Sequence, residues 1–239
     1  MNLRGKVCLI TGANSGIGEA IAHAFAADGA SVIVNGRRAA ENERVAKDLR
    51  ERYEAEVTVV TGDVADESFC LELIDKGFAV RGRLDVLVNN AGVGSSGRIA
   101  DTTTEEFDRV QKINLYSCFW LSREAFKRME QQEEVEPKLR GAILNIASIV
   151  GVEAWSGIGT YATSKHGMMA LTRAMAEEGE EAGIRVAAIC PAMVTTAMTG
   201  AEGPEYIQPE DIANTARYLL GLSAAAWPTE VVVRRRGAD

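Results

Sequence analysis

The stretch V-C-L-I-T-G-A-N-S-G-I-G, Val7 to Gly18, decides the fold that we expect for this chain. An apolar run typical of a buried strand leads directly into a glycine-rich turn. After the turn, apolar residues recur with the spacing of one helix face: Ile17, Ala20, Ile21, Ala24 and Phe25. The stretch therefore predicts a strand, a tight turn and an amphipathic helix in direct succession.

The turn itself has glycines at Gly12, Gly16 and Gly18. Glycine lets a backbone turn tightly and approach a pyrophosphate, which the N-terminus of the following helix favours electrostatically. The spacing is G-x-x-x-G-x-G, and a turn that needs glycine only for its geometry is the alternative. Because the turn follows the first strand, we interpret it as a dinucleotide site that also includes Asn14, Ser15 and Ile17.

The same alternation of short apolar runs and helical patterns continues along the chain. Further strands are predicted at 31–35, 57–61, 84–89, 142–147, 185–190 and 230–234. Most of them are continuously apolar, as in a parallel sheet that helices cover on both faces. We expect a single α/β domain over residues 1–239, with a Rossmann-like, doubly wound parallel sheet of about seven strands in the order 3-2-1-4-5-6-7.

The composition is that of an ordinary globular protein, with 46% hydrophobic and 25% charged residues among 239. A net charge of −8 disfavours nucleic-acid binding, and no apolar run is long enough to span a membrane. Four cysteines among apolar neighbours, without a C-x-x-C pair, predict buried free thiols in a reducing compartment, the cytoplasm. Neither histidine lies in a metal-binding motif, so we expect no metal site.

A second stretch indicates a site for proton transfer: S-I-V-G-V-E-A-W-S-G-I-G-T-Y-A-T-S-K, Ser148 to Lys165. On a helix, Tyr161 and Lys165 share a face, with Cβ atoms roughly 5–6 Å apart. An ammonium about 4 Å from the phenol would stabilise the phenolate by roughly 4 kcal/mol, enough to lower the tyrosine pKa by about three units. We therefore expect Tyr161 to exchange a proton near neutral pH, beside Ser148 as a hydrogen-bond donor to a substrate oxygen.

A proton shuttle of this kind suits the interconversion of a carbonyl and an alcohol, for which a nicotinamide cofactor supplies the hydride. About 20 positions after the glycine turn, an acid selects a free ribose and an arginine selects a 2′-phosphate. The stretch N-G-R-R, Asn35 to Arg38, has no acid. Gly36 leaves room and Arg37 offers a bidentate fork, so we favour NADP(H) over NAD(H). The alternative is that Arg37 and Arg38 are solvated surface charges.

Several turn and polar residues follow directly on predicted strands. Ligands bind at the carboxyl edge of open α/β sheets, so we expect one site to include Gly12, Arg37, Asp63, Asn90, Ser148 and Pro191. Asn114 lies on the apolar face of a helix predicted to run to about Met129. It is either a core asparagine bonded to backbone or a residue that opens the helix to hold a water for proton transfer from Lys165.

With these motifs the chain resembles the short-chain dehydrogenase/reductase family over nearly its whole length. The matching elements are T-G-x-x-x-G-I-G at 11–18, Asp63-Val64, N-N-A-G at 89–92, Asn114, Ser148, Y-x-x-x-K at 161–165 and P-A-M-V-T-T at 191–196. The resemblance implies a catalytic set of Asn114, Ser148, Tyr161 and Lys165, in which Lys165 also grips the nicotinamide ribose. It implies cofactor contacts by Asp63 at the adenine, Asn90 beside the ribose, Val194 and Thr196 at the carboxamide, with Val64, Ala91, Gly92 and Pro191 as further contacts.

The chain also departs from the family pattern. Ala192 replaces the usual glycine, and Ser15 stands where NADP-dependent members often have a second basic residue. The connection from Pro191 to Pro209 is short, and the C-terminus E-V-V-V-R-R-R-G-A-D lacks a glycine-rich ending. Members commonly form homotetramers or homodimers, so the resemblance implies an oligomer.

We expect an NAD(P)-dependent oxidoreductase that transfers hydride between nicotinamide C4 and a small carbonyl or secondary alcohol substrate, with a ketone or a 3-oxoacyl thioester favoured. The alternative is a non-catalytic NADP(H)-sensing or scaffold protein on the same fold. Such a protein would be free to lose Ser148, Tyr161 or Lys165, and this chain keeps all three. Five apolar residues are candidates for a substrate pocket or for ordinary packing: Val150, Val152, Trp155, Met193 and Met198.

Overall fold

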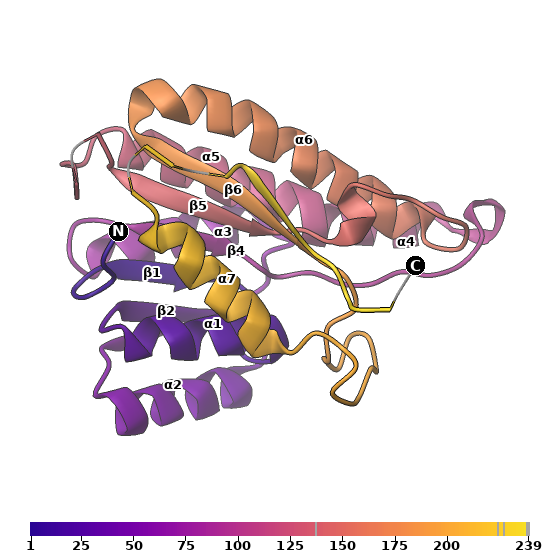
Figure 1. Cartoon of the computed structure of the whole chain (residues 1–239), viewed down its shortest axis with the longest axis horizontal. Helices are drawn as coiled ribbons and strands as arrows, with labels where there is room; N and C mark the ends of the chain where they lie inside the picture. The colour runs from indigo at the N-terminus through magenta and orange to yellow at the C-terminus, as the bar shows by residue number, and fades with distance from the viewer. Residues whose placement is uncertain (137, 224, 227, 238–239) are drawn as a thin grey trace.

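The computed structural model describes residues 1–136, 138–223, 225–226 and 228–237. Within these residues the strands form a seven-stranded sheet in the order β3-β2-β1-β4-β5-β6-β7. Every pair of neighbouring strands is parallel. The predicted Rossmann-like, doubly wound sheet and its strand order are therefore confirmed (Figure 1).

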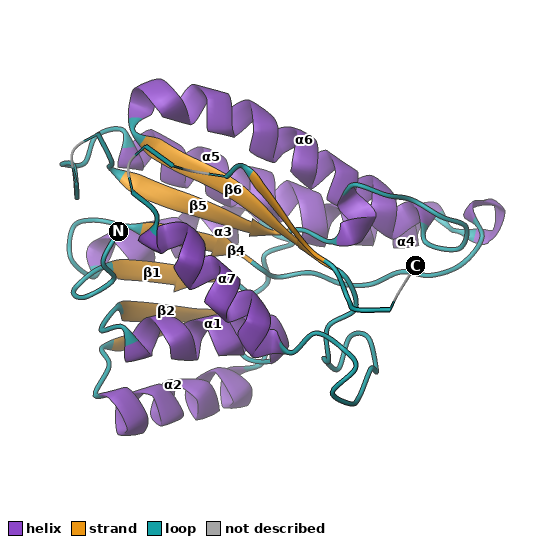
Figure 2. Cartoon of the chain, viewed as in Figure 1, coloured by secondary structure: helices purple, strands orange, loops and turns teal. Residues whose placement is uncertain are grey.

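The observed strands differ from the predicted ranges by a residue or two at their ends. They are β1 (Val7–Ile10), β2 (Ser31–Gly36), β3 (Val57–Thr61), β4 (Val86–Asn89), β5 (Gly141–Ile146), β6 (Ile184–Pro191) and β7 (Glu230–Val233). The helices between them, purple in Figure 2, are α1 (Gly16–Ala27), α2 (Ala39–Tyr53), α3 (Glu67–Ala79), α4 (Thr104–Gln111), α5 (Ser117–Met129), α6 (Gly159–Ala182) and α7 (Pro209–Gly221).

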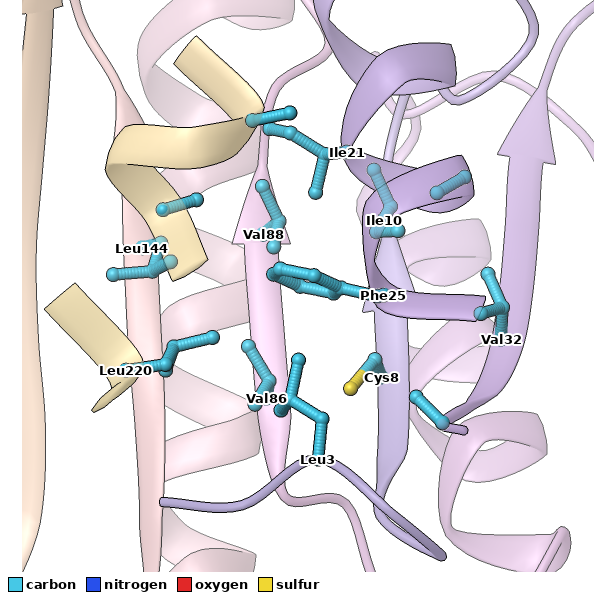
Figure 3. Close-up of a cluster of buried hydrophobic side chains, with 14 of the residues drawn as sticks. Leu3, Cys8, Ile10, Ile21, Phe25, Val32, Val86, Val88, Leu144 and Leu220 are labelled. Atoms are coloured by element: carbon cyan, nitrogen blue, oxygen red, sulfur yellow. The ribbon is translucent and has the colours of Figure 1, made fainter. Parts of the chain in front are cut away.

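Side chains that alternate along the strands enter two hydrophobic layers, one on each face of the sheet. Cys8 and Ile10 of β1 belong to the layer under α1 and α7, whereas Val7 and Leu9 belong to the layer under α3 and α5. Figure 3 shows Phe25 of α1 among the side chains of β1 and β4. Phe25 is fully buried, and burial of such a side chain stabilises the fold by roughly 1.5–3 kcal/mol.

The helix that was predicted to run without interruption to about Met129 is not continuous. It consists of α4, a π-helical segment Lys112–Tyr116, and α5. A π-helical turn widens the backbone by one residue and is often found at functional sites. Asn114 lies inside this segment, so the uninterrupted helix is wrong and the helix does open at this residue. Asn114 is also fully buried and hydrogen-bonded to the Val93 backbone, as the alternative of a core asparagine requires.

The carboxyl ends of the strands point to one side of the sheet, the right side in Figure 1. The loops after β4, β5 and β6 and the C-terminal segment gather on that side. Among the described residues, no helix is both long enough and apolar enough to cross a membrane. The same residues contain no group of three or more His, Cys, Asp or Glu side chains placed to hold a metal ion.

Candidate functional site

The turn between β1 and α1 needs its glycines for conformation and for space. Gly12 and Gly16 have φ values of 63° and 56°, in the left-handed region that favours glycine. A Cβ at Gly12 would lie 3.0 Å from the Ala91 Cα, and one at Gly18 would lie 2.4 Å from the Gly12 carbonyl oxygen. The turn therefore packs directly against the segment that follows β4.

The N-terminus of α1 faces the same edge. Ser15 is its N-cap residue with extended backbone, and its side chain makes no capping hydrogen bond to any residue that the structure describes. The first N–H groups of a helix lack intrahelical partners, and an anion satisfies them well. A Cβ at Gly16 would be 3.2 Å from Thr196 Cγ2, so the loop after β6 lies beside this turn.

Thr11, which the sequence analysis left without a role, holds this edge together. Its Oγ1 accepts hydrogen bonds from the backbone N–H groups of Asn90 and Ala91, each at 3.0 Å. The Asn90 Nδ2 donates in return to the carbonyl oxygens of Thr11 at 2.9 Å and Gly12 at 3.1 Å. The predicted cofactor residue Asn90 thus points into the glycine turn, and β1 is tied to β4 by side chains as well as by backbone.

Asn114 and Lys165 meet next to the N-N-A-G segment. The Asn114 Nδ2 donates to the Val93 carbonyl and to Ser164 Oγ, each at 3.0 Å, and its Oδ1 accepts from the Val93 N–H at 2.8 Å. A Cβ at Gly92 would be 3.3 Å from Asn114 Oδ1 and 3.8 Å from Lys165 Nζ. The segment Asn90–Gly92 therefore runs from the glycine turn to the predicted catalytic lysine.

Ser148 and Tyr161 approach each other from two elements. Ser148 follows β5 and begins a short 3₁₀ helix, where its Oγ accepts from the Val150 N–H at 3.2 Å. Tyr161 lies in the first turn of α6, and its side chain hydrogen-bonds to that of Ser148. Lys165, one turn further on, donates from Nζ to the Ile146 carbonyl at 2.9 Å. The four predicted catalytic residues are thus brought to one edge of the sheet.

The predicted lowering of the Tyr161 pKa is wrong. Burial raises the pKa of Tyr161, and the hydrogen bond to Ser148 lowers it by less than burial raises it. Lys165 Nζ lies 5.8 Å from the centroid of the Tyr161 ring and is bound to a carbonyl oxygen instead of the phenol. Burial lowers the pKa of Lys165 to about 8, because a charged group loses hydration in the interior.

The residues after β2 and β3 also face each other. Arg37 and Asp63 form an ion pair at 3.7 Å, with 63% and 46% of their side chains exposed. Arg38 is the N-cap residue of α2 and pairs with Glu41, away from Asp63. The expectation that Gly36 leaves room is wrong, because a Cβ at Gly36 would lie 2.3 Å from Asn14 Nδ2 and 2.6 Å from Asn42 Oδ1.

The remaining predicted cofactor residues lie at this edge as part of its packing. Val64 is buried in the layer under α3, and its carbonyl accepts from Cys70 Sγ. Ile17 packs against the layer under α1. Pro191 ends β6, and Val194 is buried and bridges to Ile207.

The loops at this edge of the sheet carry an apolar rim. Ile99, Trp155, Met193 and Met198 are exposed large apolar residues on the loops after β4, β5 and β6. These loops meet, because the Gly97 N–H donates to the Gly157 carbonyl at 2.8 Å. Of the other pocket candidates, Val150 is buried and Val152 is partly buried.

The segment after β7 contacts two of these loops, which the sequence did not indicate. Arg234 forms an ion pair with Glu153, in the loop after Ser148. The Arg235 guanidinium lies 4.9 Å from the centroid of the Tyr206 ring, in the segment between β6 and α7. The short connection from Pro191 to Pro209 is therefore contacted by Arg235, and the loop after Ser148 by Arg234.

Comparison with known proteins identifies the family. A model of the short chain dehydrogenase family matches residues 6–206, a range that includes all of the predicted site residues. The chain belongs to the short-chain dehydrogenase family. It is accordingly an oxidoreductase of a family that binds NAD(P)(H), acts on small-molecule substrates and is often oligomeric.

Relatives of this short-chain dehydrogenase match it over almost their full length. An uncharacterized oxidoreductase of Staphylococcus aureus is 33% identical over 235 residues, covering 97% of this chain and 98% of the relative. A 3-oxoacyl-[acyl-carrier-protein] reductase of Rickettsia conorii is 34% identical over 238 residues, covering 94% and 93%. The structure of an alcohol dehydrogenase from Thermococcus sibiricus complexed with 5-hydroxy-NADP has a TM-score of 0.90 at 28% identity, covering 99% of each chain.

Thr11→Val is expected to lower the free energy of unfolding by about 2–4 kcal/mol, because it leaves two partly buried backbone N–H groups without an acceptor. The substitution keeps the shape and volume of the side chain, so packing changes little. Chemical denaturation measures the effect. Thr11→Ser is the matched control, since it keeps the hydroxyl, and equal destabilisation by the two variants would contradict the role assigned to Oγ1.

Proposed function

We propose that this short-chain dehydrogenase is an NADP(H)-dependent reductase of an apolar carbonyl compound. The observation that carries the proposal is the convergence of Ser148, Tyr161 and Lys165 beside the glycine-rich turn. A scaffold protein that only binds a nucleotide has no need for this arrangement, in which Ser148 is hydrogen-bonded to Tyr161 and Lys165 is buried one helical turn further on.

In the proposed reaction the cofactor, when bound, supplies the hydride to the carbonyl carbon of the substrate. The Tyr161 hydroxyl donates its proton to the carbonyl oxygen, so that an alcohol forms. The Ser148 hydroxyl, already hydrogen-bonded to Tyr161, donates to the same oxygen as negative charge develops on it. The two hydroxyl groups thereby fix the orientation of the carbonyl.

The direction of the Tyr161 pKa shift supports reduction. Burial raises this pKa, so the phenol carries its proton throughout the neutral range and is ready to act as an acid. Alcohol oxidation needs the phenolate, which the same burial disfavours. The positive charge of an oxidised nicotinamide near the phenol would offset part of that penalty.

Lys165 and Asn114 have supporting roles in this proposal. The Lys165 ammonium keeps two N–H donors beyond the one given to the Ile146 carbonyl, and these suit ribose hydroxyls. Asn114 supports the segment Asn90–Gly92 through two hydrogen bonds to Val93. Asn114 Oδ1 and Lys165 Nζ both lie beside Gly92, and a water between them would complete a proton relay.

The preference for NADP(H) is supported by charge. The residues after β2 carry two arginines and no acid, and a 2′-phosphate would give Arg37 a stronger partner than the exposed carboxylate of Asp63. The cofactor analogue in the Thermococcus sibiricus alcohol dehydrogenase is an NADP derivative, which points the same way.

The apolar rim supports a substrate with a hydrophobic body next to its carbonyl group. Exposed methionines adapt their shape to different apolar ligands, and Met193 and Met198 are both about half exposed. The similarity to a 3-oxoacyl-[acyl-carrier-protein] reductase makes a 3-oxoacyl thioester a candidate beside simple ketones.

Tyr161→Phe is expected to lower turnover by about 10²–10⁴-fold, because the proton donor is lost while the ring still packs. Cofactor binding should persist, because the phenol hydroxyl is not its main anchor. NADPH consumption with a panel of ketones and 3-oxoacyl thioesters measures turnover, and fluorescence titration measures binding. Tyr218→Phe, on the exposed face of α7, is the control, and full turnover by the Tyr161 variant would reject the mechanism.

Arg37→Ala is expected to raise the dissociation constant of NADPH by roughly tenfold and to leave that of NADH unchanged, because NADH lacks the 2′-phosphate that this guanidinium would bind. Arg38→Ala removes the same charge at a side chain that pairs with Glu41, and it serves as the control. Equal loss of NADPH affinity in both variants would indicate a general charge effect.

The rate constant kcat/KM for NADPH is expected to fall as pH rises above about 8. This rate constant depends on the protonation of groups in the free enzyme, and Lys165 loses its positive charge above that pH. A limb near the usual lysine value of about 10.4 would contradict this expectation.

Unfolding of the protein would not explain the expected fall in kcat/KM above about pH 8. The folded pKa of Lys165 lies below its unfolded value, so the unfolded chain binds more protons between the two, and the lysine contribution to stability rises with pH.

The contribution of the buried cysteines to stability changes with pH in the opposite direction. Burial raises the pKa of Cys70 and Cys118 to about 12, so their contribution is full below pH 9 and is lost as pH rises towards 12. Thermal unfolding across the profile verifies that the fold persists.

A further inference from the structure

The segment that follows β7 lies beside the loops of the candidate site. Val233, the last residue of β7, is paired with Pro191, the last residue of β6. The Ala192 N–H donates to the Val233 carbonyl at 2.8 Å. The next residues, 234–236, are three consecutive arginines, and Figure 1 shows this segment leaving the sheet on the side where the carboxyl ends of the strands point. The arginines therefore lie at the same edge of the sheet as Ser148.

Arg234 contacts the loop that follows Ser148. Its guanidinium donates a hydrogen bond of 2.5 Å to the Glu153 carboxylate. The Glu153 N–H donates in turn to the Ile149 carbonyl at 2.9 Å, so this carboxylate is attached to the short 3₁₀ turn that Ser148 begins. The exposed Trp155 of the apolar rim comes two residues later in the same loop. Arg234 therefore restrains the loop from which Trp155 extends.

Arg235 contacts the connection between β6 and α7. Its guanidinium lies 4.9 Å from the centroid of the Tyr206 ring, within the distance at which a cation is attracted to an aromatic face. The next residue, Ile207, donates from its N–H to the Met193 carbonyl at 3.3 Å and accepts from the Thr195 N–H at 2.8 Å. The two ends of the connection are thus joined, and a contact at Tyr206 also restrains Met193 of the apolar rim.

The two contacts bring together loops that lie far apart in the sequence. Glu153 follows β5 and Tyr206 precedes α7, yet their partners are adjacent residues of one segment. The ion pair is exposed and the cation–π contact is partly exposed, so both add little to the stability of the fold. Opening an exposed loop also costs little free energy. Weak contacts are therefore sufficient to bias the position of these loops.

We propose that Arg234 and Arg235 are positioning residues that hold the two loops carrying the apolar rim. They act through Glu153 and Tyr206 and touch neither the cofactor nor the reacting atoms. The loops held in this way bind the apolar body of the substrate, so the two arginines set the affinity for the substrate and leave the chemical step unchanged. This inference rests on the proposed function, because it requires an apolar carbonyl substrate between these loops.

The test is the substitution of the two arginines, Arg234→Gln and Arg235→Leu, singly and together. The KM of the ketone or 3-oxoacyl thioester that the wild-type protein reduces is expected to rise roughly threefold in each single variant and roughly tenfold in the double variant, as the loss of weak surface contacts implies. The kcat should stay within about twofold of the wild-type value, because the loss of uniform substrate binding raises KM alone. NADPH consumption measures both constants.

Rescue variants separate positioning from a general structural effect. Glu153→Arg combined with Arg234→Glu exchanges the charges of the ion pair and should restore the wild-type KM. Tyr206→Phe keeps an aromatic face for the Arg235 guanidinium and should also keep the wild-type KM. Tyr206→Leu removes that face and should raise KM as much as Arg235→Leu does.

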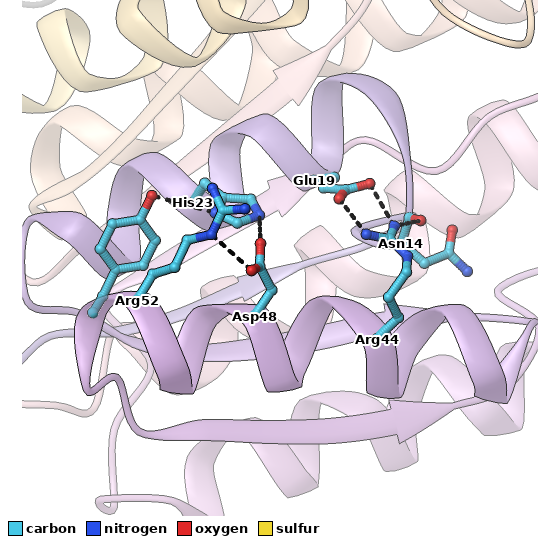
Figure 4. Close-up of polar contacts among 7 residues, drawn as sticks. Asn14, Glu19, His23, Arg44, Asp48 and Arg52 are labelled. Atoms are coloured by element: carbon cyan, nitrogen blue, oxygen red, sulfur yellow. Dashed lines mark hydrogen bonds and ion pairs between the residues drawn. The ribbon is translucent and has the colours of Figure 1, made fainter.

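Hydrogen exchange measured by mass spectrometry gives a readout that needs no turnover. Backbone amides in residues 149–158 and 193–207 should exchange faster in the double variant, because their loops open more often. The matched control is Arg52→Gln, which removes an exposed arginine of α2 from its ion pair with Asp48 at 2.7 Å (Figure 4). Both KM and the exchange rates should keep their wild-type values in this control.

A wild-type KM or wild-type exchange rates in the double variant would overturn the inference. An equal change in the Arg52 variant, or a charge exchange that leaves KM raised, would overturn it as well. If the wild-type protein reduces no compound of the panel, the proposed function fails instead, and the exchange rates still decide whether the two arginines hold the loops.

Discussion

The site depends on one hydroxyl group more than on any other single contact. Thr11 directly follows the first strand, and its Oγ1 accepts hydrogen bonds from the backbone N–H groups of Asn90 and Ala91, which follow the fourth strand. These strands are neighbours in the sheet although far apart in sequence. Because the hydroxyl satisfies two donors that would otherwise be partly buried and unpaired, the glycine turn and the path to Lys165 are built as one surface.

Burial sets the chemistry that this surface supports. The ammonium of Lys165 is almost completely enclosed, and the phenol of Tyr161 is held by Ser148, so desolvation outweighs the attraction between the lysine and the tyrosine. The result is a phenol that keeps its proton and a lysine that loses its proton more easily than an exposed one. An expectation based on Coulomb attraction alone had the wrong sign, because it omitted the hydration that both groups give up.

The sequence was sufficient to predict the sheet order and the meeting of the site residues. Apolar periodicity and glycine turns are local signals for strands and helices. Residues that follow parallel strands then lie together, because the carboxyl ends of those strands meet at one edge of the sheet. It was not sufficient for side-chain partners. Gly36 was interpreted as open space, yet Asn14 and Asn42 fill it from two other elements. The contacts of Arg234 with Glu153 and of Arg235 with Tyr206 also link distant segments, and no local pattern indicates them.

The two sides of the site differ in how they are held. On the cofactor side, buried and partly buried hydrogen bonds of Thr11, Asn42 and Asn114 fix the backbone. On the substrate side, the loops are joined by exposed contacts, among them the ion pair of Arg234, and surface pairs of this kind contribute little to stability. Local opening costs least where contacts are few and exposed. A firmly held cofactor edge beside more weakly held loops is compatible with the proposed reduction of apolar carbonyl compounds of differing shape.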